Sequence, residues 1–382
     1  MHPDSNLDLS IYVHIPFCAR KCLYCDFLSF AAKDDLIKDY FDALSKEICL
    51  TADTYKDYRV RSVFFGGGTP SLPDAEYICN ILRVLFSNFN ISKDAEISIE
   101  VNPGTASFDK LERYKASGIN RISIGAQSFD DDELKRLGRI HDSAAFYRTY
   151  EDAVRAGFEN INIDIMSALP GQSLDSYLST VQKAVELKPS HISAYSLIVE
   201  EGTPFFDMDL DLPNEDDDRA MYHETKRILA KNGYHRYEIS NYALGDGEKN
   251  ECYHNKVYWE RGNYLGLGLG SSSMINDVRF SNITDIMEYI NRLSKSDTVI
   301  CEREELDEKS CMEEFMFLGL RLVKGVDTEL FYKQFGRTVR DVYGDVIDKC
   351  KGLGLLENNG NYLRLTDKGL DVSNTVMADF IF

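Results

Sequence analysis

Apolar and polar positions over the first two hundred residues alternate in a way that predicts repeated strands and helices. Six runs rich in β-branched and aromatic residues read as strands, at residues 9–16, 62–68, 96–103, 121–128, 160–171 and 191–199. The stretches between them, beginning with 35–50, have the spacing of amphipathic helices. This order predicts a parallel α/β sheet with right-handed crossovers. Six βα units fall short of the eight of a closed barrel, so the sheet is either open or a partial barrel.

The pattern changes after Met274. An acidic segment at 301–314 leads into an apolar helical run at 315–323, and further short helices and a small β-element at 362–366 follow. Helices followed by a small β-element predict a C-terminal winged-helix-like module. We therefore expect three parts: an α/β domain over 1–275, a connecting segment over 276–300, and a C-terminal domain over 301–382.

Charge and composition narrow the classes of partner. The chain has 382 residues, enough for two or three domains, with 63 acidic and 43 basic side chains and a net charge of -20. This charge repels nucleic-acid phosphates and anionic lipid headgroups, so binding to nucleic acid is not expected. The first residues lack the basic and apolar regions of an export signal, and no apolar run approaches the ~18 residues of a membrane span. We expect a cytoplasmic location.

Three of the nine cysteines form a motif. Cys18, Cys22 and Cys25 have the spacing C-x3-C-x2-C directly after the first predicted strand, and in a reducing compartment such a cluster indicates metal ligands. A loop with this spacing can place three thiolates around a cubane iron–sulfur cluster and leave one iron without a protein ligand. The alternative is a structural zinc site with His14 as fourth ligand, although the spacing differs from the paired C-x2-C of zinc ribbons.

Polar residues and glycines gather at the predicted carboxyl ends of the strands. Gly66 to Thr69, Glu100, Gln127 and Asp164 all fall there, at the edge where parallel α/β folds place their sites. The three glycines 66–68 are expected to let the backbone approach a ligand closely. The downstream Gly-Lys-Ser/Thr of a phosphate loop is missing from this motif, so it does not predict nucleotide triphosphate binding.

The cysteine motif, with Tyr24 before its third cysteine, resembles that of the radical S-adenosylmethionine (SAM) superfamily. YVHIPFC, GGGTPS, EVNP, GAQSF, GRIH and DIMSALPGQ follow in the order found in the coproporphyrinogen oxidase-like branch. That branch includes oxygen-independent coproporphyrinogen III oxidases and HemW-type heme chaperones. The resemblance covers nearly the whole chain.

The resemblance implies a partial (βα)6 barrel with a 4Fe-4S cluster on Cys18, Cys22 and Cys25. The free iron of the cluster is then chelated by the amino and carboxylate groups of SAM, and an electron donor that the sequence does not identify reduces the cluster. The positions that match SAM contacts of the family are Tyr12, Gly68, Thr69, Glu100, Gln127, Arg139 and Asp164.

Two features separate the branches. The oxidases resemble C-x3-C-x2-C-x-C, whereas Phe27 stands at the last position here, and the first predicted strand begins too early for the amino-terminal extension of the oxidases. The segment HNKVYW, from His254 to Trp259, matches the H-N-x-x-Y-W pattern of HemW-type heme chaperones. Imidazole is a common axial ligand of heme iron, and aromatic side chains can stack on a macrocycle.

The resemblance therefore implies a heme chaperone that binds heme, with His254 as the candidate ligand, and passes it to an acceptor protein. Cys252 is a second candidate ligand. Membrane association is expected only through the acceptor. The alternative function is an oxygen-independent coproporphyrinogen III oxidase, which removes two carboxyl groups from propionate side chains as carbon dioxide. A zinc-bearing interaction protein is the third alternative.

Overall fold

Residues 7–381, which the computed structural model describes, fold around a twelve-stranded sheet. The six predicted strands are all present: β1 (Asp8–Ile15), β2 (Arg59–Gly67), β3 (Asn90–Val101), β4 (Arg121–Gln127), β5 (Asn160–Ser167) and β6 (His191–Ser196). They lie side by side in chain order, and each neighbouring pair is parallel. The prediction of a parallel α/β sheet is confirmed.

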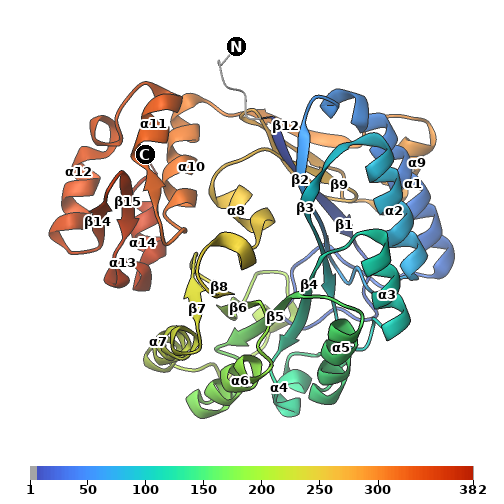
Figure 1. The fold of residues 1–382 in the computed structure, drawn as a ribbon, viewed down its shortest axis with the longest axis horizontal. Helices are drawn as coiled ribbons and strands as arrows, with labels where there is room; N and C mark the ends of the chain where they lie inside the picture. The colour runs from blue at the N-terminus through green and yellow to red at the C-terminus, as the bar shows by residue number, and fades with distance from the viewer. Residues whose placement is uncertain (1–6, 382) are drawn as a thin grey trace.

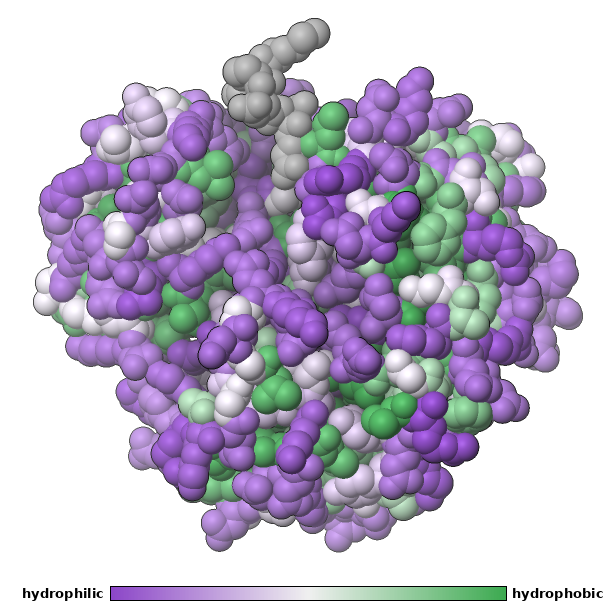
Figure 2. Space-filling model, viewed as in Figure 1, coloured by the Kyte–Doolittle hydropathy of each residue, from purple (hydrophilic) through white to green (hydrophobic). Residues whose placement is uncertain are grey.

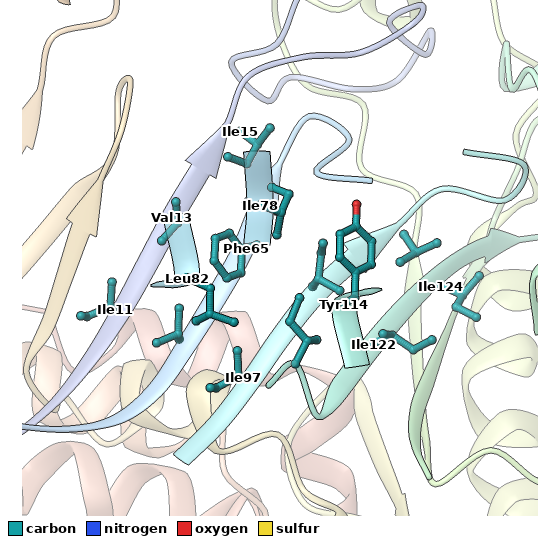
Figure 3. Packing of buried hydrophobic residues seen from close by; sticks show 14 of the residues in the cluster. Ile11, Val13, Ile15, Phe65, Ile78, Leu82, Ile97, Tyr114, Ile122 and Ile124 are labelled. Carbon is teal, nitrogen blue, oxygen red and sulfur yellow. The ribbon is translucent and has the colours of Figure 1, made fainter. Parts of the chain in front are cut away.

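Helices cover the outer face of this sheet (Figure 1). They are α1 (Asp34–Ala52), α2 (Ala75–Asn88), α3 (Phe108–Ser117), α4 (Asp131–Arg136), α5 (Ser143–Arg155), α6 (Leu174–Glu186) and α7 (Glu215–Lys231). On β1, Ile11, Val13 and Ile15 pack toward Ile78 and Leu82 of α2 (Figure 3). Because successive side chains of a strand point to opposite faces, the intervening positions of β1 face the interior of the sheet's curve.

Further strands extend the sheet at both edges. On one side, β9 (Tyr264–Leu267) pairs in parallel with β1, and β10 (Ser272–Ile275), β11 (Val278–Asn282) and β12 (Ile300–Glu305) follow as antiparallel strands. On the other side, β8 (Asn241–Leu244) and β7 (Tyr234–Arg236) follow β6. The described strands end at β12 and β7, which do not pair with each other, so the barrel is partial.

The segment 276–300 contributes to this main sheet. It holds β11 and helix α9 (Ile286–Ser294), and β12 continues to Glu305. The sequence pattern indicated a connection here. The division of the chain at 275 and 300 stays a prediction, but the sheet itself runs through both positions.

The C-terminal module has its own antiparallel sheet and apolar cluster. Its elements are α10 (Glu308–Gly319), β13 (Val326–Asp327), α11 (Thr328–Phe335), α12 (Val339–Gly352), β14 (Leu356–Asn359), β15 (Tyr362–Leu365), α13 (Asp367–Asp371) and α14 (Ser373–Ala378). Met316, Phe331 and Phe380 are fully buried in its core. This arrangement of helices around a small sheet agrees with the predicted winged-helix-like module.

Helix α8 (Tyr253–Trp259), which carries the HNKVYW segment, lies between the module and the curved sheet (Figure 1). It contacts β2 on one side and α10 on the other. The segment singled out for heme is therefore part of the junction between the two parts of the molecule.

The surface agrees with the acidic, polar composition. The face in Figure 2 is mostly hydrophilic, with hydrophobic residues scattered over it. Within residues 7–381, none of the helices has both the length and the apolar composition that a membrane-crossing segment needs.

Candidate iron–sulfur and cofactor site

The loop that carries the three cysteines is held by backbone hydrogen bonds from several parts of the chain. Cys18 N–H donates to Phe30 O at 3.1 Å, and Leu23 N–H donates to Leu137 O at 3.1 Å. Leu23 O in turn accepts from Phe205 N–H at 3.0 Å. These bonds tie the loop to its own return segment, to the segment after α4 and to the segment after β6.

The three thiols are partly exposed and line one pocket at the carboxyl ends of the strands. Thr69 Oγ1 lies 3.5 Å from Cys18 Sγ, and Arg139 Nη1 donates to Cys22 Sγ at 3.8 Å. Burial raises the pKa of the Cys25 thiol, and the neighbouring Cys22 adds to this shift. A fixed guanidinium beside the loop favours the thiolate form that metal binding needs.

The donor set fits a cluster better than a single ion. Within the described chain, no three His, Cys, Asp or Glu side chains lie close enough to share one ion. On a cubane each thiolate binds a different iron, so the three sulfurs lie farther apart than they do around one zinc. His14 Nε2 donates to Leu28 O at 2.8 Å and Nδ1 accepts from Tyr12 Oη at 3.0 Å, so both ring nitrogens have partners inside the protein.

Six of the seven residues predicted to contact SAM line the same pocket as the cysteines: Gly68, Thr69, Glu100, Gln127, Arg139 and Asp164. They come from the ends of β2, β3, β4 and β5 and from the loop after α4. Tyr12 lines a second, deeper cavity instead. Their roles toward SAM stay predictions.

Arg139 connects several strands at the top of the site. Its Nη2 donates to Gly125 O at 2.8 Å and to Asn102 Oδ1, while Nη1 reaches Cys22. These partners belong to β4, to the segment after β3 and to the cysteine loop. Arg139 therefore holds a half-buried positive charge in a fixed position beside the thiols.

Two half-buried carboxyl groups, Glu100 and Asp164, line the pocket and interact electrostatically. Burial and the nearby Asp164 raise the pKa of Glu100 to about 8. Burial also raises the pKa of Asp164, although Ser123 Oγ and Asn162 Nδ2 donate to it at 3.0 and 2.7 Å. Carboxyl groups in this state can exchange hydrogen bonds with ribose hydroxyls or pair with an ammonium group.

Gln127 sits in a strained backbone conformation. Its φ is +66°, which side chains other than glycine rarely adopt, and the register of β4 against β5 shifts between Gly125 and Gln127. The side chain is buried and its Oε1 accepts from Tyr195 Oη at 3.1 Å. Strain of this kind collects at functional sites, where it directs a side chain.

The glycines of the GGGTPS motif serve the protein's own packing. Gly67 has φ +110°, and a Cβ there would lie 2.5 Å from His14 Cε1. A Cβ on Gly68 would lie 2.8 Å from Phe17 O. The sequence suggested that the glycines make room for a ligand, and this stays a prediction, since Gly67 and Gly68 line the cysteine pocket. At these two positions the missing Cβ also makes room for β1 and the segment after it.

Tyr12 and His254 meet in the deeper cavity, inside the curve of the sheet. Its lining is formed by Tyr12, Phe64, Glu100, Arg121, Ser123, Asn162, Asp164, Ser193, His254, Asn255 and Tyr258. Glu100, Ser123 and Asp164 line both this cavity and the cysteine pocket. The two cavities therefore share a wall.

His254 is bound on both sides within this interior. Its Nδ1 donates to Ser62 Oγ at 2.8 Å, and its Nε2 accepts from Tyr258 Oη at 3.0 Å. The ring stacks on Phe64 with 5.0 Å between centroids. Burial lowers the pKa of His254 to about 3, so the imidazole is neutral. Iron ligation through Nε2 requires the Tyr258 hydroxyl to turn away.

Sequence reasoning missed several residues of the two cavities. Asn102, Ser123 and Tyr195 line the cysteine pocket, and Arg121 lines the deeper cavity. The sequence contained a signal for the residues on β4, because Arg121, Ser123 and Gly125 alternate with the outward-facing isoleucines of that strand. Polar residues at every second position of a strand mark a polar interior.

Comparisons with known proteins agree with this geometry. Residues 12–184 match the model of the radical SAM superfamily, and residues 306–372 match that of the HemN C-terminal domain. The heme chaperone HemW of Haemophilus influenzae is 39% identical over 98% of both chains, and that of Lactococcus lactis is 36% identical over 97% of both.

A solved structure of similar architecture is the coproporphyrinogen III oxidase HemN from Escherichia coli, described as a radical SAM enzyme. It is 25% identical, and the match covers 98% of this chain and 90% of that one with a TM-score of 0.85. The shared fold includes the C-terminal module. The full-length relatives decide the branch: the chain belongs to the radical SAM superfamily and, within it, to the HemW family.

Proposed function

We propose that this protein is a heme chaperone that binds heme and passes it to an acceptor protein. The observation that carries the proposal is the similarity over nearly the entire chain to relatives named heme chaperone HemW. Phe27 supports it, because this side chain is 60% exposed beside the cysteine loop and can neither ligate a metal nor undergo redox chemistry.

In this proposal Cys18, Cys22 and Cys25 hold a 4Fe-4S cluster, and SAM binds at its open corner. When bound, the cluster supplies an electron and a coordination site. Around it, Arg139 positions the cysteine loop through Cys22, and Thr69 lies against Cys18. Glu100 and Asp164, which line the same pocket, are the proposed acceptors of hydrogen bonds from SAM's hydroxyl and ammonium groups.

His254 is the proposed heme ligand, and the hydrogen bond from Tyr258 governs its availability. His254→Ala removes the imidazole and also leaves the hydroxyls of Ser62 and Tyr258 without this partner. Tyr258→Phe instead frees Nε2 and keeps the ring. If Nε2 ligates the iron, His254→Ala weakens hemin binding about tenfold or more, while Tyr258→Phe binds at least as tightly as the native chain. Equal hemin affinity of His254→Ala and the native chain refutes this ligand.

The test of the whole proposal is an oxygen-free hemin titration of the reconstituted protein beside an activity assay. We expect stoichiometric hemin binding, transfer to an apo-hemoprotein and no decarboxylation of coproporphyrinogen in the presence of SAM and a reductant. Robust formation of protoporphyrinogen would establish the alternative, an oxygen-independent coproporphyrinogen III oxidase. Replacing the three cysteines by serine should remove iron and sulfide together. Zinc without sulfide would refute the cluster.

The partners follow from this function. They are heme, an acceptor protein, and an electron donor if SAM is reductively cleaved. We propose that the protein acts in the cytoplasm and reaches a membrane only through its acceptor.

A further inference from the structure

Arg121 is a buried guanidinium whose charge no close partner neutralises. It is the first residue of β4, is 2% exposed and lines the deeper cavity. Its guanidinium forms no hydrogen bond or ion pair with any residue in 7–381, and its buried Nε has no partner. Burial removes the water from this guanidinium, and the carboxylates that attract it, Glu96 and Asp164, form no ion pair or hydrogen bond with it within residues 7–381.

The neighbouring groups do not fill this role. The carboxylates of Glu96 and Asp164 attract Arg121 from β3 and β5, and Cys252 and Tyr237 also face it. Glu96 is already engaged, since it accepts from the N–H groups of Tyr253 and His254 at the start of α8. Asp164 accepts from Ser123 and Asn162. Both nearby carboxylates are thus oriented by other donors.

The position of Arg121 defines how a ligand would reach it. Arg121 lies four residues before Gly125 on β4, roughly 13 Å along the strand. The carbonyl of Gly125 accepts a hydrogen bond from Arg139. Ser123 and its register partner Glu100 lie between these levels, Asp164 pairs with Gly125, and all three residues line both cavities. The deeper cavity has a volume of about 190 Å³, which is enough for a side arm that carries a carboxylate.

We propose that Arg121 anchors a carboxylate subsite in the deeper cavity, which receives a carboxylate-bearing arm from a ligand seated toward the cysteine pocket. The guanidinium offers paired N–H groups that match a carboxylate. Glu100 and Asp164 then meet hydrogen-bond donors on the same ligand. Two sources share this chemistry: a heme propionate and a short free carboxylic acid, since the carboxylate of SAM is assigned to the open iron of the cluster. The subsite does not depend on heme being the ligand.

The test uses the cluster-loaded protein, the variant Arg121→Gln and the matched control Arg83→Gln, an exposed arginine on α2. Four probes are titrated: hemin, hemin dimethyl ester, SAM and sodium propionate. Hemin dimethyl ester keeps the macrocycle and removes both negative charges. Melting temperatures of the unliganded proteins are measured in parallel.

We expect Arg121→Gln to weaken the binding of hemin or propionate about tenfold or more, with a melting temperature equal to or above that of the native chain. Loss for hemin but not for its ester assigns a propionate, and loss for propionate alone assigns a free acid. SAM serves as the control ligand, because its carboxylate is assigned to the cluster, and a loss confined to SAM counts against the subsite. Unchanged affinities for all probes, or a lowered melting temperature without loss of affinity, overturn the proposal.

If Arg121→Gln fails to fold, measurements on the native chain alone still test the subsite. On the native chain, propionate should raise the melting temperature or compete with hemin, and the absence of both effects counts against the subsite. If hemin does not bind the native chain at all, the heme-chaperone proposal fails, while the propionate titration still decides the role of Arg121.

Discussion

Glu100 shows how a single side chain inside the curved sheet is governed by its surroundings. Its carboxyl accepts from Gly67 N–H at 3.2 Å, but burial and the nearby Asp164 both oppose its charge and raise its pKa to about 8. The group is therefore largely protonated at neutral pH in the folded chain. The unfolded chain releases this proton near the ordinary value of 4.5.

This difference predicts a pH dependence of stability. Between the two pKa values the unfolded state binds fewer protons, so the Glu100 contribution to the free energy of unfolding falls as pH rises from about 5 to about 8, by up to about 1.4 kcal/mol per unit. Glu100→Gln should remove this contribution. Denaturant unfolding of the ligand-free protein at several pH values measures it.

The matched control is Glu112→Gln, an exposed position on α3. This change should leave the pH profile of the native chain unaltered. Parallel profiles for Glu100→Gln and the native chain would show that Glu100 ionises normally in the fold.

Individual residues also show which features of the site could not be predicted from the sequence. The spacing of Cys18, Cys22 and Cys25 pointed to one loop, and the structure brings their thiols to one pocket. The sequence marked His254 as a candidate ligand, but it did not reveal that His254 lies on α8 with both ring nitrogens hydrogen-bonded inside the sheet. Its partners are 4 and 192 positions away in sequence, and the distant one, Ser62, depends on tertiary packing.

At the scale of elements, α8 depends on a group outside itself. It has seven residues, too few for a helix to persist alone in water. The Glu96 carboxylate of β3 accepts from Tyr253 N–H at 3.0 Å and from His254 N–H at 3.1 Å, and it places negative charge at the positive end of the helix. A strand side chain thus performs the role of a helix cap.

We expect Glu96→Ala to lower the free energy of unfolding by about 1–2 kcal/mol and to speed amide hydrogen exchange within α8. Denaturant unfolding and exchange followed by mass spectrometry measure the two effects. Glu112→Ala on exposed α3 is the control and should change stability by no more than about 0.5 kcal/mol. Unchanged exchange in α8 would mean that packing alone holds the helix.

The elements that the sequence predicted correctly are those with long apolar alternation. All six strands of the parallel sheet and the helices that follow them were of this kind. Strand β9 was missed because the segment YLGLGLGS contains three glycines, which interrupt the alternation of side chains. The edge strand β12 reads ICEREE and is largely exposed, so its sequence resembles a solvated acidic segment.

At the scale of the whole molecule, Arg261 joins the module to the sheet. It is 3% exposed in its side chain and donates to Asp277 at 2.6 Å and to Glu314 of α10 at 3.0 Å. Arg279 of β11 donates to the same Glu314 at 2.6 Å. Arg261 and Glu314 are nearly buried here, so these two depend on their partners to offset the loss of water, while Asp277 and Arg279 stay partly exposed.

Arg261→Ala should lower the free energy of unfolding by about 3 kcal/mol, because it leaves the Glu314 carboxylate buried with one partner fewer. We also expect a protease to cleave the C-terminal module of this variant faster than its sheet. Arg340→Ala removes an exposed pair with Asp348 in the module and should cost no more than about 1 kcal/mol. Equal losses in the two variants would contradict a central role for Arg261.

The short passage from β12 to α10 restricts how the module can move. β12 ends at Glu305 and α10 begins at Glu308, while β12 remains paired with β11 through Arg279 and Glu304. From β11 the hydrogen-bonded ladder continues through β10 and β9 to β1, whose far end leads into the cysteine loop. A rotation of the module must therefore bend this strip of sheet or break its register, so displacement at one end is mechanically transmitted toward the other.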